Sequence, residues 1–266
     1  MRLYAGYALD LDGTVYLGDE LLPGAAETIA SLRRAGAAIV FVTNKPLETA
    51  EQYAANLDRL GIPATADDVV TAVDALVHYL RERHATNRLL LISEEVVHRR
   101  LVDEGFEVTD DPATAEVVVV SFDRTFSYAK LYAGFRAVRE NGAAIVATNP
   151  DPFCPTPDGG LPDCAAMLAA LEACSGGRAE AVVGKPSPTM ARALLGRLGL
   201  DAADVAVVGD RVTTDVAMGQ SVGAAGILVL TGATTADALD RYGIKPDHVL
   251  ADIRELLPRI PEGASR

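Results

Sequence analysis

Two aspartates one residue apart follow a short apolar run in the stretch Tyr7-Ala8-Leu9-Asp10-Leu11-Asp12-Gly13-Thr14. If residues 3–9 form a buried strand, Asp10 stands at its carboxyl end, where open α/β sheets bind ligands. Alternation along the chain turns Asp10 and Asp12 the same way, and Gly13 lets the chain turn. Neighbouring carboxylates repel unless a cation or a shared proton separates them. The pair therefore indicates a divalent metal or a partly protonated carboxylate; the alternative is an ordinary Asp-Gly turn.

Four predicted strands end in polar residues of this kind. The residues at these ends are Asp10 and Asp12, Thr43 and Asn44, Lys185, and Asp210 with Asp215. The carboxyl ends of parallel strands share one edge of a sheet, so we expect these side chains to meet there. Carboxylates suit Mg²⁺, and a lysine neutralises a phosphate or a carboxylate. Together the groups fit phosphoryl transfer through an aspartyl-phosphate.

Other chemistries fit the sequence less well. Gly184-Lys185 is not a Walker loop, because Ala179 replaces the required glycine and Pro186 the required Ser or Thr. The four histidines lack zinc spacing. The three cysteines, Cys154, Cys164 and Cys174, lack C-x-x-C spacing and indicate reduced intracellular thiols.

The composition limits the partners. A net charge of −13 opposes binding to nucleic acid and to anionic membranes. Residues 216–236 carry no charge, but their glycines and polar residues predict a helix, a turn and a strand inside a core. No signal peptide fits before Asp10. We therefore expect a cytoplasmic protein with no nucleic-acid and no membrane partner.

Helical and strand patterns alternate along the chain and predict an α/β fold. A hairpin is expected around Gly18-Asp19, and strands at Ala37–Val42, Val205–Val208 and Gly226–Leu230. Residues 76–182 are expected to form a second α/β unit, with strands at Arg88–Ser93, Val117–Phe122 and Ala181–Val183. The proline-rich segment Asp151–Asp163 is a lid candidate.

Two stretches of the chain resemble each other. The run Gly36–Val40 leads to Thr43-Asn44, and the similar run Gly142–Val146 leads to Thr148-Asn149. One interpretation is a coincidence of common strand residues. The other is a pair of similar loops that serve one cleft from opposite sides.

The four motifs together resemble those of the haloacid-dehalogenase-like (HAD) phosphatases. They are Asp10–Thr14, Thr43, Lys185 and Gly209-Asp210-x-x-x-Thr214-Asp215. The interval between Thr14 and Thr43 is too short for a cap domain, whereas the interval from Thr43 to Lys185 has room for a large α/β cap. This placement, with Ala147–Asp151 and Leu228–Gly232, resembles the NagD-type subfamily, which includes para-nitrophenyl and sugar-phosphate phosphatases.

The resemblance implies a doubly wound, Rossmann-like parallel sheet as a catalytic core, made of residues 1–75 and 183–266, with residues 76–182 as an inserted α/β cap. It implies Asp10 as the nucleophile and Asp12 as the acid and base. Thr43 would bind the phosphoryl group, Asn44 would help line the site, and Lys185 would neutralise the developing charge. Mg²⁺ would be held by Asp10, the Asp12 backbone carbonyl and Asp210, with Asp215 close by. Lys45 and Pro162–Ala165 depart from the family pattern.

The resulting hypothesis is a Mg²⁺-dependent phosphomonoesterase for a small phosphorylated metabolite, with a sugar phosphate as the favoured substrate. The alternatives are a phosphoglycolate, nucleotide or broad-range para-nitrophenyl-type phosphatase and, less favoured, a phosphotransferase or a binding protein. Asn149 and Asp151 on the cap are expected to contact the leaving group. Cap-mediated dimers are common in such families, so a homodimer through the cap is a further expectation.

Overall fold

The computed structural model describes residues 2–154 and 160–257. The chain divides into two compact units. The first contains Met1–Thr43, Ala50–Val70 and Leu194–Arg266, and the second contains Asn44–Thr49 and Thr71–Ala193. The predicted boundaries are 75/76 and 182/183, whereas the main segment of the second unit is Thr71–Ala193. The division into a catalytic core and a cap stays a prediction.

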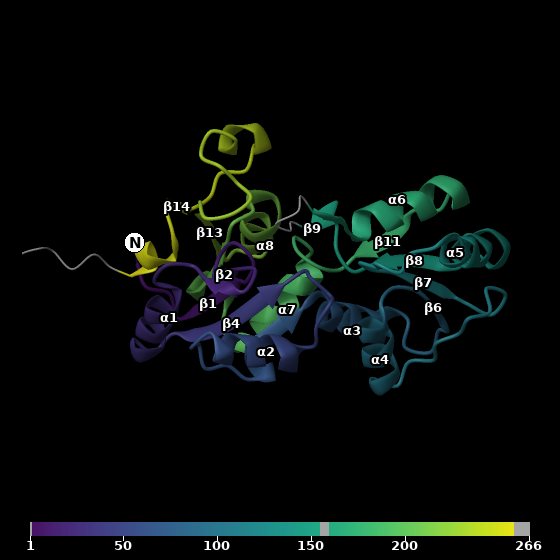
Figure 1. Cartoon of the computed structure of the whole chain (residues 1–266), viewed down its shortest axis with the longest axis horizontal. Helices are drawn as coiled ribbons and strands as arrows, with labels where there is room; N and C mark the ends of the chain where they lie inside the picture. The colour runs from purple at the N-terminus through teal and green to yellow at the C-terminus, as the bar shows by residue number, and fades with distance from the viewer. Residues whose placement is uncertain (1, 155–159, 258–266) are drawn as a thin grey trace, which may run out of the picture. The chain divides into compact units, whose positions relative to one another are not determined.

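The first unit is built on a six-stranded sheet in the order β14-β13-β12-β1-β4-β5, part of which is visible in Figure 1. Neighbouring strands from β14 to β4 run parallel to one another. Its central strands are almost entirely apolar and are buried along their whole length, as expected for a sheet covered on both faces. The strands are β1 (Gly6–Asp10), β4 (Ala38–Thr43), β5 (Val69–Thr71), β12 (Val205–Gly209), β13 (Ala225–Val229) and β14 (His248–Leu250).

Helices and a small hairpin complete this unit. The hairpin pairs β2 (Tyr16–Leu17) with β3 (Glu20–Leu21). Leu9, Phe41 and Val208 of the sheet share a hydrophobic core with Ile29 and Leu57 of the helices. The helices are α1 (Ala25–Arg34), α2 (Ala50–Arg59), α8 (Ala217–Ser221), a π-helical turn η3 (Val212–Val216) and the short 3₁₀ helices η1 (Ala66–Asp68), η2 (Ala202–Asp204), η4 (Leu239–Tyr242) and η5 (Ile253–Leu256); α7 (Pro188–Leu198) begins in the second unit and ends in the first.

The second unit has its own parallel sheet in the order β11-β8-β7-β6. Its strands are β6 (Leu89–Ile92), β7 (Val117–Val120), β8 (Ala144–Ala147) and β11 (Ala179–Val182), and its helices are α3 (Ala72–Arg83), α4 (Glu95–Asp103), α5 (Tyr128–Asn141) and α6 (Cys164–Ser175). Thr71 and Asp74 form a capping box at the start of α3. Gly142 ends α5 in the left-handed conformation that favours glycine.

The α/β class and the parallel sheets predicted from the sequence are confirmed. Strand bounds differ by a few residues: the strand expected at 3–9 is Gly6–Asp10, so Asp10 is its last residue. Strands β5 and β14 were not predicted. In the lid candidate, β9 (Phe153–Cys154) pairs with β10 (Leu161–Pro162), and residues 155–159 lie outside the described part of the chain.

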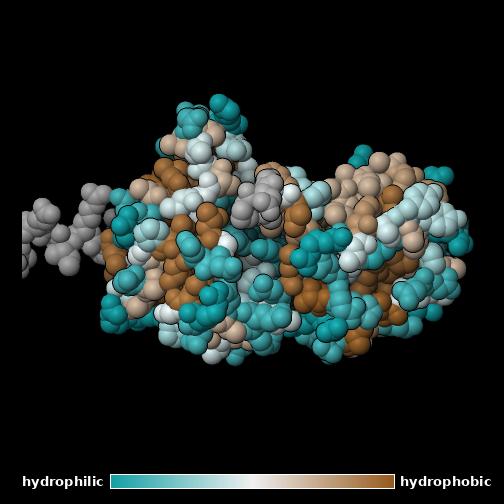
Figure 2. Space-filling view, in the orientation of Figure 1, coloured by the Kyte–Doolittle hydropathy of each residue, from teal (hydrophilic) through white to brown (hydrophobic). Residues whose placement is uncertain are grey.

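The surface mixes polar and apolar side chains (Figure 2). The pale brown area over α6 in that view matches an alanine-rich helix with Ala166, Ala169 and Ala173 exposed. In the part of the chain that the structure describes, no helix is long and apolar enough to cross a membrane. None of the three cysteines forms a disulfide.

Candidate active site

Three buried carboxylates come together in the first unit. Asp10, Asp210 and Asp215 each offer a carboxylate oxygen, and these oxygens lie within 4.8 Å of one another. Their exposed fractions are 8%, 5% and 1%. We call these three residues the acidic cluster. Three buried charges of one sign repel strongly, and an all-oxygen donor set matches the preference of Mg²⁺.

Neighbouring strands bring two of these carboxylates together. β1 and β12 are adjacent and parallel, with Leu9 opposite Val208, so Asp10 and Asp210 both leave the sheet at its carboxyl edge. The turn η3 then returns the chain so that Asp215 lies against Gly209. A Cβ on Gly209 would lie 2.1 Å from Cγ of Asp215, so this close approach requires glycine.

Nearby hydroxyl and amide groups hold the carboxylates of this cluster. The Thr14 hydroxyl donates to Oδ2 of Asp10 at 3.3 Å. Asp215 Oδ2 accepts from the Arg211 amide at 3.2 Å and from the Thr214 hydroxyl at 3.3 Å. The sequence places Thr14 and Thr214 next to the aspartates but does not reveal these contacts.

Two other predicted residues of the first unit lie at the same sheet edge. Thr43 is the last residue of β4, and Val42 before it lies opposite Asp10 in the β1–β4 register. Thr43 is buried. Asp12 follows β1, is half-buried and forms an isolated bridge with Tyr16, and its side chain is not a member of the acidic cluster.

The remaining predicted residues meet inside the second unit. Asn44 bonds the main chain of Lys185 in both directions: the Lys185 amide donates to Asn44 Oδ1 at 2.7 Å, and Asn44 Nδ2 donates to the Lys185 carbonyl at 3.1 Å. Asn44 Nδ2 also donates to Asp151 Oδ2 at 2.9 Å. A Cβ on Gly184 would lie 2.6 Å from Asn44 Oδ1, so glycine is needed beside this contact.

Asn149 extends this network and has no exposed surface. Its Nδ2 donates to the Asn44 carbonyl at 3.2 Å, and its Oδ1 accepts from the Asp151 amide at 3.0 Å. The two similar Thr-Asn loops of the sequence therefore touch directly. We call Asn44, Asn149 and Asp151 the amide cluster. Nδ2 of Asn149 also donates to Asp163 at 3.4 Å, a partner that the sequence did not single out.

The thiol of Cys164, which is buried next to this network, is protonated at neutral pH and is therefore not a nucleophile. Burial raises the pKa of the Cys164 thiol to about 11, although a hydrogen bond from the Asn149 backbone opposes the shift. Its Sγ donates to the Val120 carbonyl at 3.4 Å. A neutral, buried thiol is a packing group.

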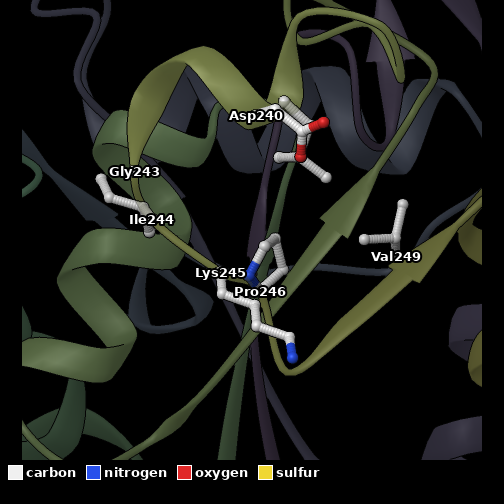
Figure 3. A pocket seen from close by; sticks show the side chains of 7 residues that line it. Asp240, Gly243, Ile244, Lys245, Pro246 and Val249 are labelled. Carbon is white, nitrogen blue, oxygen red and sulfur yellow. The ribbon is translucent and has the colours of Figure 1, made fainter.

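A pocket of about 380 Å³ lies in the first unit between η4 and β14 (Figure 3). None of the predicted site residues lines it. The side chains around it are mostly apolar, with Asp240 and Lys245 as the charged members. It therefore does not mark the acidic cluster. The lining residues are Leu239, Asp240, Gly243, Ile244, Lys245, Pro246 and Val249.

Comparisons with known proteins agree with these features. A family model described as haloacid dehalogenase-like hydrolase matches residues 7–107, and a HAD-hydrolase-like model matches residues 182–256. Sugar-phosphatase AraL of Bacillus subtilis is 34% identical over 97% of this chain and 94% of its own.

Two solved structures share the fold. A p-nitrophenyl phosphatase from Archaeoglobus fulgidus has a TM-score of 0.89 and 33% identity, covering 96% of this chain and 98% of its own. NagD from Escherichia coli K-12 has a TM-score of 0.86 and 28% identity, covering 97% and 100%. The chain belongs to the haloacid-dehalogenase-like hydrolases. Within them it is an enzyme of the NagD-type phosphatases.

Proposed function

We propose that this phosphatase is a Mg²⁺-dependent phosphomonoesterase that hydrolyses a small sugar phosphate through an aspartyl-phosphate. The observation that carries the proposal is the buried Asp10 carboxylate at the end of β1, clustered with Asp210 and Asp215. Similarity to the sugar-phosphatase of Bacillus subtilis supports a sugar phosphate as the substrate. The all-oxygen donor set supports Mg²⁺.

In the first proposed step, a carboxylate oxygen of Asp10 attacks phosphorus. The bond from phosphorus to the ester oxygen breaks, and that oxygen takes a proton from the Asp12 carboxyl group. In the second step, a water gives its proton to the Asp12 carboxylate and attacks phosphorus. The Asp10–phosphorus bond breaks, phosphate leaves, and both aspartates regain their starting states.

The other predicted residues have binding roles in this proposal. Thr43 donates to a phosphoryl oxygen, and the Lys185 ammonium neutralises its charge. Asn44 holds the Lys185 main chain, consistent with its two hydrogen bonds there. Asp10, the Asp12 carbonyl and Asp210 would hold Mg²⁺, with Asp215 in support. The bound ion would supply positive charge beside the transferring group.

A broad-range aryl phosphatase is the second candidate. Similarity to the p-nitrophenyl phosphatase of Archaeoglobus fulgidus favours it. Two predictions from the sequence remain predictions. One is that the chain consists of a catalytic core and a cap that selects the substrate, and the other is that it forms a homodimer through the cap.

A substrate panel tests the proposal. Sugar phosphates, nucleoside monophosphates, phosphoglycolate and para-nitrophenyl phosphate are ranked by kcat/KM with Mg²⁺ present. We expect sugar phosphates to rank first. A second experiment measures the turnover of Asp10→Asn protein. Its matched control is Asp19→Asn, a substitution at an exposed residue of the hairpin. A flat ranking supports the aryl phosphatase. Activity that survives in Asp10→Asn protein contradicts the aspartyl-phosphate.

A further inference from the structure

The loop Thr231–Thr234 follows β13 and lies against Asp210. The Ala233 amide donates to Oδ2 of Asp210 at 2.5 Å. The next amide, of Thr234, donates to the Asp210 backbone carbonyl at 3.1 Å. Consecutive amides of one loop therefore hold both the side chain and the main chain of a member of the acidic cluster.

Thr234 also fastens the chain beyond Asp210. Its hydroxyl oxygen accepts from the Val212 amide at 3.2 Å. Val212 begins the η3 turn, which leads to Asp215. The Thr234 side chain is only 3% exposed, so a lost bond here leaves a buried amide without this acceptor. One threonine thus holds the segment between the carboxylates of Asp210 and Asp215.

Two glycines leave room for the Asp210 carboxylate. A Cβ on Gly232 would lie 2.0 Å from Asp210 Oδ2, and a Cβ on Gly13 would lie 2.8 Å from the same oxygen. The loop also reaches the Asp10–Gly13 segment, because the Thr231 hydroxyl donates to the Gly13 carbonyl at 2.5 Å. Any side chain at residue 232 would push the carboxylate out of its present orientation.

We propose that the Thr231–Thr234 loop is a positioning element that fixes the orientation of the Asp210 carboxylate for a divalent cation. The inference rests on the metal site of the proposed function. Three carboxylates that repel one another would rotate apart without such restraint. Holding one of them in place before the cation arrives lowers the cost of binding it.

Titration calorimetry of metal-free protein with Mg²⁺ tests the loop without measuring activity. Thr234→Val removes the acceptor and keeps the shape, whereas Thr234→Ser keeps the hydroxyl. We expect Thr234→Val to weaken Mg²⁺ binding by about 10-fold to 100-fold, the usual cost of losing a group that orients a ligand. We expect Thr234→Ser to bind within about threefold of wild type. Thr28→Val, a buried threonine of α1, is the control and should leave the Kd unchanged.

A purely structural role gives a different result. In that case Thr234→Val lowers the melting temperature in chelator but binds Mg²⁺ with the wild-type Kd, and this outcome overturns the proposal. If Thr234→Val does not fold, Gly232→Ala replaces it, with Gly196→Ala as control, since a Cβ on Gly196 has no neighbour within 4 Å. A wild-type Kd for folded Gly232→Ala also overturns it. If the wild-type protein binds no Mg²⁺, the metal site of the proposed function fails first.

Discussion

The acidic cluster of the first unit and the amide cluster of the second unit both follow the ends of parallel strands, but they differ in how their charges are balanced. The acidic cluster gathers three carboxylates within 4.8 Å. In the amide cluster, donors meet acceptors: Asn44 bonds the Lys185 main chain, and Asn149 bonds the Asn44 carbonyl. The first arrangement calls for a cation from outside, whereas the second stabilises the fold by itself. Polar residues that follow strand ends thus gather like charges in one cluster and position the chain in the other.

The largest effect is expected from removing Asp10, the proposed nucleophile in the acidic cluster. Asp10→Asn should lower kcat at least about a thousandfold, because the covalent route is lost. The amide still accepts a hydrogen bond from Thr14, so the circular dichroism spectrum should match wild type. Asp19→Asn is the control. Substantial turnover by clean Asp10→Asn protein would rule out this nucleophile.

The dependence of activity on Mg²⁺ should distinguish Asp210 from Asp215 within the acidic cluster. Chelator should stop turnover, and Mg²⁺ should restore it. Asp210→Ala should raise the Mg²⁺ concentration for half-maximal activity by more than about tenfold, and Asp215→Ala by less. The reason is that Asp215 Oδ2 already accepts from Arg211 and Thr214, which suits a supporting role. Equal shifts would make Asp215 a direct ligand, and full activity in chelator would remove the metal from the proposal.

Substitutions in the two clusters should change the free energy of unfolding in opposite directions when it is measured in chelator. Asn149→Ala should lower the free energy of unfolding by about 2–3 kcal/mol, because buried hydrogen-bonding groups lose their partner. Asp210→Asn should raise it by about 1 kcal/mol, because one of three repelling charges is removed. Chemical denaturation measures both, with Asn87→Ala as a half-buried control. A loss of stability in Asp210→Asn protein would show that repulsion does not dominate the acidic cluster.

The smallest effect concerns substrate choice at the amide cluster. Asn149 is fully buried, whereas Asp151 is partly exposed, so Asp151 is the better candidate to contact a leaving group. Asp151→Ala should lower kcat/KM for the best sugar phosphate about threefold to tenfold more than for para-nitrophenyl phosphate, which has no sugar hydroxyls. Asp110→Ala, an exposed substitution in the same unit, is the control. Equal losses of kcat/KM on both substrates would mean that Asp151 has a structural role and does not select the substrate.

The sequence predicted that Asp10 and Asp210 would meet, but it grouped the Asp12 carboxylate with them, whereas the third member of the cluster is Asp215. Apolar runs that end in Asp10 and Asp210 read as buried parallel strands, and adjacent strands then bring the two carboxylates together. The sequence did not predict that the Thr231–Thr234 loop holds Asp210, because the bond comes from the backbone amide of Ala233, and every residue except proline has such an amide. Nor could residue type tell whether Asn149 faces a ligand or the chain. Strand β14 was missed because its three residues are too few to show a period.

The order of the strands sets the order in which the enzyme can assemble during synthesis. The sheet of the second unit uses strands that follow one another closely along the chain, from β6 to β11. The sheet of the first unit pairs β1 with β12, so Tyr7 cannot pair with its partner Ala206 until residue 206 has been made. Pairings between distant residues form slowly, and a nascent chain emerges from its amino end. We therefore expect the second unit to fold while β1 is still without its neighbour β12. The acidic cluster can form only later, after Asp210 and Asp215 have left the ribosome.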